Sequence, residues 1–165
     1  MKKFCAFAAT LSILATGQVL SQYPNPRGET TLDQVTIEFG RPSTRGRDVL
    51  ALMPAGSYWR MGADLNTTLE SGVDLKFGDQ SFPKGSYNLL AHLKDNGEDW
   101  ELVICEDIEE GFRPGNTVAV APLELTRGAE EVDPMTIELR AREGQSELLL
   151  SWGFYRLSAL FSQAD

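Results

Sequence analysis

Hydrophobic and polar residues alternate along much of the chain, which is the pattern of β-strands with one buried face. The candidate strands are Val35–Phe39, Val73–Phe77, Gln80–Phe82, Ser86–Leu93, Trp100–Cys105, Thr117–Ala121, Met135–Ala141 and Glu147–Trp152. Short strands that follow one another at this spacing are typical of sandwiches and barrels. We predict a single all-β domain of about eight to ten short strands, an antiparallel β-sandwich or a flattened barrel.

Turn residues separate these strands. The clearest hairpin turn is Asp95–Asp99, which contains Asn96-Gly97, because Asn and Gly tolerate the positive φ angles of tight turns. Tyr155–Phe161 fits both a terminal strand and a short amphipathic helix, and we favour the strand. No long segment combines helical periodicity with helix-capping residues, so we predict no long helix.

The first 21 residues have the composition of a secretory signal. Lys2 and Lys3 precede an uncharged run from Phe4 to Gly17, and Ser21 stands at the end of the segment. The apolar run is too short for a stable membrane span. We therefore predict a signal peptide over 1–21, an extended leader over 22–30 and a β-sandwich domain over 31–162. This implies export to the periplasm or the outside of the cell, with no membrane span after cleavage.

Charge and composition exclude several classes of function. The chain has a net charge of −9, and cleavage would remove two lysines and make it −11. A strongly acidic protein repels phosphate backbones, so we expect no nucleic-acid partner. Cys105 would be the one remaining cysteine, and His92 is the one histidine. An internal disulfide, a cysteine-based zinc cluster and multi-histidine sites are thereby excluded, and we expect no metal and no cofactor.

Arginine is concentrated in one stretch of this acidic chain. Over residues 27–60 five arginines face four acidic residues, whereas 61–165 has 8 basic and 20 acidic residues. Guanidinium groups make fixed, bidentate contacts with carboxylates and phosphates. The stretch therefore predicts either a buried ion-pair network or an anion-binding site. A local pair between Arg60 and Asp64 would be a structural device of the first kind.

Several motifs occur in a fixed order in the first half of the chain. They are Val35-x-Ile37-x-Phe39-x-Arg41-Pro42, Gly46-Arg47, Pro54-x-Gly56-x-x-Trp59-Arg60-x-Gly62-Ala63-Asp64-x-x-Thr67 and Phe82-Pro83-x-Gly85-x-Tyr87, followed by Trp100. With these motifs the chain resembles the exported bacterial family catalogued as domain of unknown function 2911, most closely from about Leu32 to Leu93. The resemblance implies a compact, exported, β-rich domain without an established activity or cofactor.

The chain departs from that family pattern at three places. Asp64 stands where the family usually has Asn, and Cys105 stands where an Asn often ends the strand. Asp107–Gly115 replaces a segment that usually contains an aromatic residue followed by glycine. A site of the family that used these positions would be altered in this member.

We select seven candidate ligand-binding residues from these motifs and from the strand that follows them: Arg41, Arg47, Trp59, Arg60, Asp64, Thr67 and His92. Pro42 restricts Arg41 to an extended conformation and so fixes its direction. In an extended segment Trp59 and Arg60 face opposite sides, so a buried Trp59 directs Arg60 to solvent or to a cleft. We assign no catalytic residue, because no Gly-x-Ser-x-Gly motif is present and His92 stands alone.

The tryptophans bear on the choice of ligand. Trp100 and Trp152 are in phase with the apolar positions of their strands and are expected in the core. Exported β-sandwich modules commonly bind sugars, whose rings stack on aromatic side chains. By this analogy of fold alone, the tryptophans suggest a carbohydrate or cell-envelope ligand. We predict a non-catalytic module that binds an anionic or carbohydrate-like envelope ligand; its partners would be an envelope glycan, a small anion or an envelope protein. The alternatives are a small hydrolase, which uses the arginines with His92 or a carboxylate, and a structural envelope protein.

Overall fold

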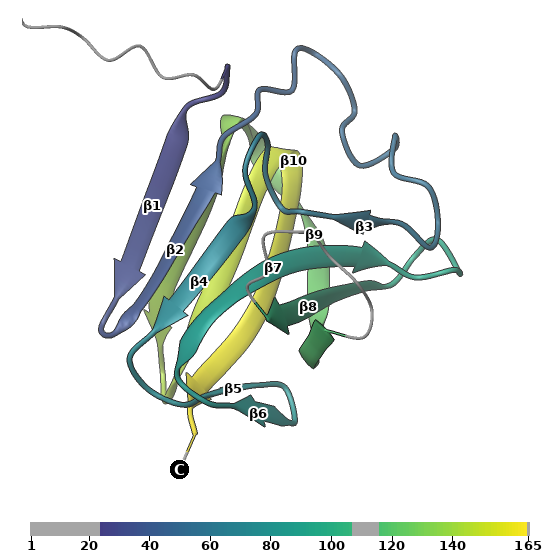
Figure 1. Cartoon of the computed structure of the whole chain (residues 1–165). Coiled ribbons are helices and arrows are strands. Elements are labelled where there is room, and N and C mark those ends of the chain that lie inside the picture. The colour runs from purple at the N-terminus through teal and green to yellow at the C-terminus, as the bar shows by residue number, and fades with distance from the viewer. Residues whose placement is uncertain (1–23, 107–115, 165) are drawn as a thin grey trace, which may run out of the picture.

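The computed structural model of the protein describes residues 24–106 and 116–164, which are nearly all β-structure (Figure 1). The predicted signal peptide and Asp107–Gly115 lie outside the described residues. The strands are β1 (Arg27–Leu32), β2 (Val35–Gly40), β3 (Tyr58–Trp59), β4 (Thr67–Ser71), β5 (Leu75–Phe77), β6 (Gln80–Phe82), β7 (Gly85–Leu93), β8 (Trp100–Glu106), β9 (Thr117–Arg142) and β10 (Gln145–Gln163). Within these residues no helix is present that could cross a membrane.

The strands form one antiparallel sheet that is not closed into a barrel. Its order is β1-β2-β4-β7-β8-β9-β10-β5-β6, and β3 pairs with β7. The prediction of a single-domain antiparallel all-β fold is confirmed. The Asn96-Gly97 turn joins β7 to β8 as expected, with Leu93 opposite Trp100 and Gly97 at a φ of 73°. Tyr155–Phe161 is strand, as we favoured.

Three of the described strands have no counterpart in the sequence prediction: β1, the two-residue β3, and β4. β1 overlaps the end of the segment 22–30, for which we predicted an extended leader, and it pairs with β2 along its whole length. Its side chains are half-buried or exposed, so no run of buried apolar residues identifies it. β4 has the sequence TTLES, in which Leu69 is the single large apolar residue. β1 and β4 are defined by backbone pairing more than by a hydrophobic pattern.

The last three predicted strands and Tyr155–Phe161 belong to two long, bent strands. β9 pairs with β8 through residues 117–123 and with β10 through most of the rest. The register between β9 and β10 shifts on both sides of Gly153, which has a φ of 58°. Bulges and left-handed glycines are the usual means by which a strand bends. The β9–β10 hairpin therefore has a tip limb, residues 136–151, and a base limb, residues 124–127 and 155–160.

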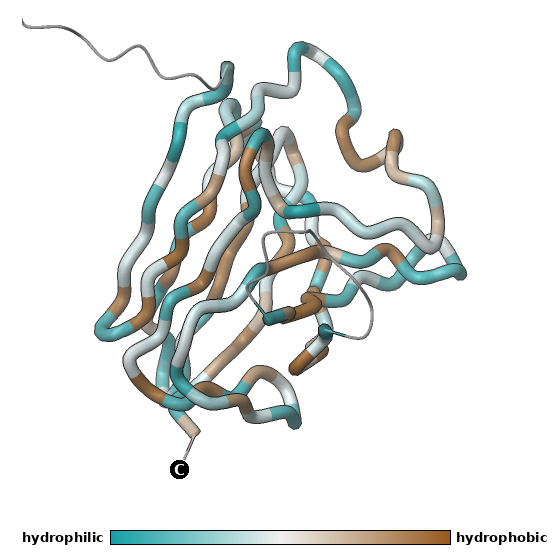
Figure 2. Tube along the Cα trace, in the orientation of Figure 1, coloured by the Kyte–Doolittle hydropathy of each residue, from teal (hydrophilic) through white to brown (hydrophobic). Residues whose placement is uncertain are grey.

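The larger of two hydrophobic clusters among the described residues is the core inside the folded sheet; the smaller consists of Leu90, Val103 and Cys105. Alternate residues of the strands point into the core, and Figure 2 shows apolar positions alternating with polar ones along the strands. Its fully buried side chains include Ile37, Leu69, Leu89, Leu102, Leu148, Leu150 and Leu157. Trp100 and Trp152 are buried in this core, as predicted. Because the core takes one face of the β9–β10 hairpin, the polar face of the hairpin is left for contact with solvent.

Candidate functional site

The three arginines that we selected from the sequence hold main-chain carbonyl groups. Arg41 Nε donates to Met135 O at 3.0 Å, and Arg47 Nε donates to Thr44 O at 3.2 Å. Arg60 Nη1 donates to Asp64 O at 2.8 Å. Between described residues, none of the three forms an ion pair with a carboxylate. The Arg41 contact connects a loop to β9, and the other two lie within single loops, so the guanidinium groups have a structural use that neither of our two interpretations foresaw.

Asp64 and Thr67, the other polar motif residues, stabilise the conformation of the loop between β3 and β4. Asp64 has a φ of 66°, a conformation that Asn and Asp tolerate better than other residues do. Its carboxylate accepts hydrogen bonds from the main chain and side chain of Asn25, at 3.1 and 3.2 Å. Thr67 is buried, and its hydroxyl donates to Met61 O. Arg60 and Asp64 do interact locally, but through the Asp64 carbonyl and not through its carboxylate.

Trp59 and His92 lie on opposite faces of the sheet. Trp59 packs inward and stacks on Trp152, with 5.4 Å between ring centroids. The partly buried ring of His92 stacks on Tyr58 at 4.1 Å, and its Nδ1 lies 3.3 Å from Glu101 Oε2. No hydrogen bond or ion pair of the described residues joins His92 to the three arginines. Of our seven residues, Trp59 thus packs against the core, His92 lies in a separate cluster, and the other five hold loops in place. Ligand binding by these residues stays a prediction.

Glu101 is the charged centre of the His92 cluster. Its Oε1 pairs with Lys94 Nζ at 2.9 Å while its Oε2 contacts His92. Partial burial raises the pKa of the Glu101 carboxyl, but hydrogen bonds from Lys94 and His92 outweigh burial, so the pKa lies below its ordinary value. The same hydrogen bond raises the pKa of Lys94. Both groups are therefore held in their charged forms.

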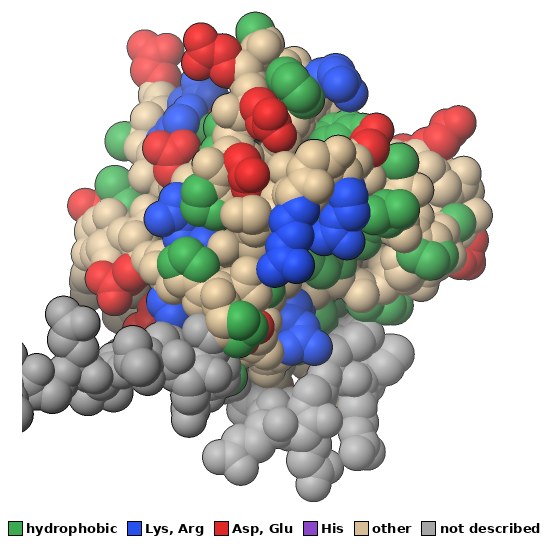
Figure 3. Space-filling view, turned by 90° about the horizontal axis from the view of Figure 1, so that it is seen from above, with side chains coloured by type: hydrophobic (Ala, Val, Ile, Leu, Met, Phe, Trp, Pro, Cys, Tyr) green, Lys and Arg blue, Asp and Glu red, His purple; other side chains and the backbone are tan. Residues whose placement is uncertain are grey.

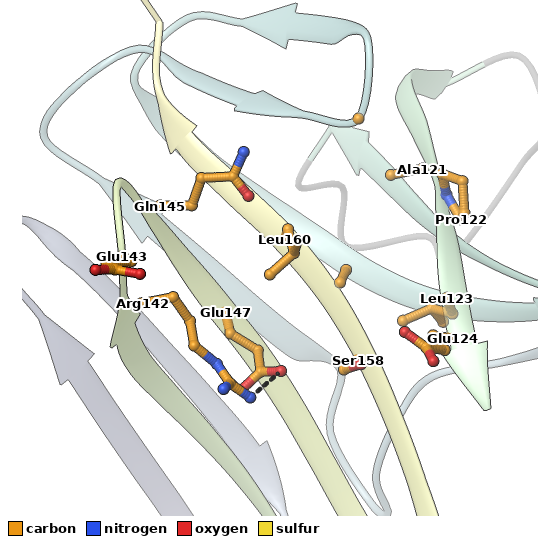
Figure 4. A pocket seen from close by; sticks show the side chains of 12 residues that line it. Ala121, Pro122, Leu123, Glu124, Arg142, Glu143, Gln145, Glu147, Ser158 and Leu160 are labelled. Carbon is orange, nitrogen blue, oxygen red and sulfur yellow. Dashed lines mark hydrogen bonds and ion pairs between the residues drawn. The ribbon is translucent and has the colours of Figure 1, made fainter. Parts of the chain in front are cut away.

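The largest cavity that we describe lies between the two limbs of the β9–β10 hairpin. It has a volume of about 840 Å³. Figure 4 shows Arg142 and Glu147 of the tip limb on one side, and Ser158 and Leu160 of the base limb on the other. Glu147 and Ser158 are eleven positions apart, so a straight strand would separate them by about 36 Å. Their presence in one cavity shows how far β10 folds back on itself.

A second cavity of about 530 Å³ continues the first toward the bend of the hairpin. The two cavities share Glu124, Arg142, Glu147 and Ser158. In the second cavity the lining positions of each strand alternate, as in Thr136, Glu138, Arg140 and Arg142 of β9, so they belong to one face of the hairpin. We call the two cavities together the hairpin groove, with an outer part (the 840 Å³ cavity) and a bend part (the 530 Å³ cavity).

A carboxylate–guanidinium pair stands where the two parts of the groove meet. Arg142 Nη2 lies 2.9 Å from Glu147 Oε1 and 2.8 Å from Oε2, and Arg142 Nε lies 3.1 Å from Oε2. The Glu147 side chain is only 9% exposed, whereas that of Arg142 is 56% exposed. A carboxylate as buried as this depends on its partner, because water cannot solvate it fully.

The charges that line the groove nearly cancel. Four carboxylates and three guanidinium groups contribute: Glu124, Glu138, Glu143 and Glu147, and Arg140, Arg142 and Arg156. Arg140 pairs with Glu138 at 2.6 Å, and Arg156 donates to the carbonyl groups of Gly153, Tyr155 and Glu130. On the face seen from above, basic and acidic side chains are likewise interspersed (Figure 3). Such a groove does not concentrate charge of one sign.

The site contains no evident metal-binding group. Among the described residues, no cluster of three or more His, Cys, Asp or Glu side chains is placed to hold an ion. The groups that line the groove can form hydrogen bonds: they are carboxylates, guanidinium groups and the hydroxyls of Ser151, Ser158, Thr126 and Thr136. The groove also offers apolar contact, through Leu149 and Leu160.

Comparison with known proteins places the chain in a family. Residues 21–160 match the family model described as Protein of unknown function (DUF2911). The chain belongs to this family. The match confirms the resemblance that the motifs of the first half indicate, and it extends through the β9–β10 hairpin of this DUF2911 protein. No curated protein and no solved structure matches the chain.

The groove residues were not among our sequence candidates. In Glu147–Trp152 the alternation does place Glu147, Leu149 and Ser151 on one face. That signal describes any half-exposed strand, so it cannot tell a groove from an ordinary solvated surface. The groove exists because β10 bends near Gly153, and no periodicity in the sequence of this DUF2911 protein predicts the angle of that bend.

Proposed function

We propose that this DUF2911 protein is an exported, non-catalytic binding module whose hairpin groove holds a neutral, carbohydrate-like ligand of the cell envelope. The observation that carries the proposal is the half-buried Arg142–Glu147 pair in the wall of a groove of about 840 Å³. A cavity of this size suits a small ligand of one or a few rings. Export is supported by the composition of residues 1–21.

The near-neutral lining favours a neutral ligand over an anion. An anion in the groove would be repelled by four carboxylates and attracted by three guanidinium groups. Each of these guanidinium groups already has a partner within the chain. Sugar hydroxyls can donate to a carboxylate and accept from a guanidinium at the same time. They can therefore bind beside the Arg142–Glu147 pair without separating its charges. This narrows the ligand that we predicted from the sequence to its carbohydrate-like alternative.

The test is a binding screen with the chain from residue 22 onward. Neutral oligosaccharides, organic acids and inorganic phosphate are titrated, and binding is followed by calorimetry. We expect saturable binding of one class of neutral saccharide, weakened about tenfold or more in Arg142→Gln and in Glu147→Gln, because each removes hydrogen bonds of a charged group. Arg27→Gln is the matched control: it removes an arginine that pairs with Glu38 outside the groove.

Two results would contradict the proposal. Saccharide binding that survives both groove substitutions would place the ligand elsewhere, and binding of anions alone would refute the neutral ligand. Export is tested separately, by the mass of the protein recovered from the periplasm or the medium. A mature mass that still includes residues 1–21 would refute cleavage of the signal.

A hydrolase is the second candidate, and one observation favours it. Glu101 contacts Nδ1 of His92, as the orienting carboxylate of a catalytic histidine does. Within the described part of the chain, however, no Ser, Thr or Cys side chain forms a hydrogen bond with His92. A hydrolase would release new reducing ends from bound oligosaccharides and would lose this activity in His92→Gln. We expect no release by the unmodified protein.

A further inference from the structure

The two parts of the hairpin groove differ in chemical character. The outer part is lined by the exposed apolar residues Pro122 and Leu160, by parts of the buried residues Ala121, Leu123 and Ala159, and by the polar residues Glu143 and Gln145. The bend part is lined mainly by polar groups: Thr126, Thr136, Glu138, Arg140, Ser151 and Arg156. The Arg142–Glu147 pair lies at the junction and belongs to both. The outer part is therefore the more apolar of the two parts of the groove.

Leu160 is an exposed apolar group of the outer part. Its neighbours Ala159 and Phe161 are buried in the core, so the alternation of β10 directs Leu160 to the opposite face, where its residue is 52% exposed. Pro122 is placed in the same way, between the buried residues Ala121 and Leu123. A single exposed leucine on a convex surface needs no explanation. Here the exposed groups converge in the largest cavity that we describe, on the apolar side of the charged pair (Figure 4).

We propose that the ligand of the hairpin groove is amphipathic: a saccharide that carries one apolar chain. The saccharide lies in the bend part, against the hydroxyl of Thr136 and the charged pair. The apolar chain lies in the outer part, against Leu160 and Pro122. This inference rests on the proposed function, since it assumes that the groove binds a saccharide. It adds the apolar chain and the orientation of the ligand.

Alkyl maltosides of increasing chain length test the inference, because their head group is constant and their chain varies. Methyl, hexyl and octyl maltoside are titrated below their micelle concentrations into the chain from residue 22 onward. Each methylene that becomes fully buried strengthens binding about fourfold. We therefore expect octyl maltoside to bind about 15-fold more tightly than hexyl maltoside, and methyl maltoside to bind weakest.

Two leucine substitutions locate the chain. Leu160→Asn should remove most of the dependence on chain length, so that octyl maltoside binds little more tightly than methyl maltoside. The control is Leu52→Asn, because Leu52 is 63% exposed and lines neither part of the groove. Both residues are exposed, so both variants should unfold in urea at the midpoint of the unmodified protein. Thr136→Val, in the bend part, should weaken all three maltosides by the same factor, because the hydroxyl that it removes faces the sugar.

The outcomes separate this inference from the proposed function. Equal affinities for methyl, hexyl and octyl maltoside would overturn the apolar chain and leave a saccharide groove intact. Equal affinity for octyl maltoside and for octyl tetraethylene glycol, which has no sugar, would overturn the saccharide and with it the proposed function. Binding of octyl maltoside that is unchanged in Leu160→Asn would overturn the orientation. Absence of binding by all three maltosides would overturn the inference as a whole.

Discussion

Burial, and not contact length, should decide how much each ion pair of the hairpin groove stabilises the fold. Two arginines of β9 allow a direct comparison, because Arg140 and Arg142 lie on the same face of one strand. The Arg140–Glu138 contact is the shorter, at 2.6 Å, but its side chains are 46% and 48% exposed. In the Arg142–Glu147 contact, at 2.8 Å, the carboxylate is nearly buried.

The expected losses follow from what each substitution leaves behind. Arg142→Ala removes three hydrogen bonds from a carboxylate that water reaches poorly, which should cost about 2 kcal/mol. This loss is smaller than the roughly 3–5 kcal/mol that is lost when a fully buried ion pair is broken, because Arg142 itself is half exposed. Arg140→Ala leaves Glu138 in water and should cost about 0.5 kcal/mol. Both substitutions replace arginine by alanine in the same strand, so the change in strand propensity cancels in the comparison.

Urea unfolding, followed by tryptophan fluorescence, measures both losses. High salt should reduce the small contribution of Arg140 and change that of Arg142 much less. A double-mutant cycle of Arg142→Ala with Glu147→Gln should give a coupling energy of about 1–2 kcal/mol. If Arg140→Ala costs as much as Arg142→Ala, our reasoning from burial is refuted. A coupling near zero would show that Glu147 is stabilised by groups other than Arg142.

Three further predictions concern other parts of the fold. Gly40→Ala should prevent folding or cost more than about 3 kcal/mol in urea unfolding, since its Cβ would overlap the carbonyl oxygen of Ala63; a loss below 1 kcal/mol would contradict this. Burial raises the pKa of Glu101, but the hydrogen bond from Lys94 helps to set it below its ordinary value. The Lys94–Glu101 pair therefore stabilises the fold at pH values above the ordinary glutamate pKa. This contribution is lost as the pH falls through the lowered pKa of Glu101. Glu101→Gln should thus destabilise the fold at pH 7, and its effect should shrink as the pH falls below the ordinary glutamate pKa; an effect that does not change with pH would contradict this. Burial also raises the pKa of Cys105, so Ellman's reagent should modify it slowly until urea unfolds the chain; rapid native reaction would contradict that burial.

Much of the fold could be predicted because alternation reports burial directly. Ser86–Leu93 and Trp100–Cys105 became β7 and β8 almost residue for residue, and Asn96-Gly97 formed the turn between them. β1 was missed because backbone pairing with β2, and not a buried face, holds it in the sheet. Long strands were divided into short ones for a related reason: β9 and β10 continue through bends where the alternation breaks.

The candidate site was harder to predict, because the charge of a stretch does not report its partners. The arginines of residues 27–60 were expected to bind anions or carboxylates, but Arg41 binds a carbonyl group of β9, and Arg47 and Arg60 bind carbonyl groups of their own loops. A carbonyl is available at every residue and leaves no mark in the sequence. The prediction of Trp152 as a core residue succeeded, since it required only the phase of its own strand.

The sequence by itself determined the β-class of this DUF2911 protein, most of its strands, its acidic surface and its family, because these depend on local periodicity, composition and motif order. The tertiary structure alone decided which polar side chains meet. Glu147 and Ser158 face one groove only because β10 folds back near Gly153, and the burial of Glu147 makes its pairing with Arg142 matter. The positive φ of Gly153 permits the bend, but both limbs also pack on one shared core, a long-range contact that no short segment of the chain encodes.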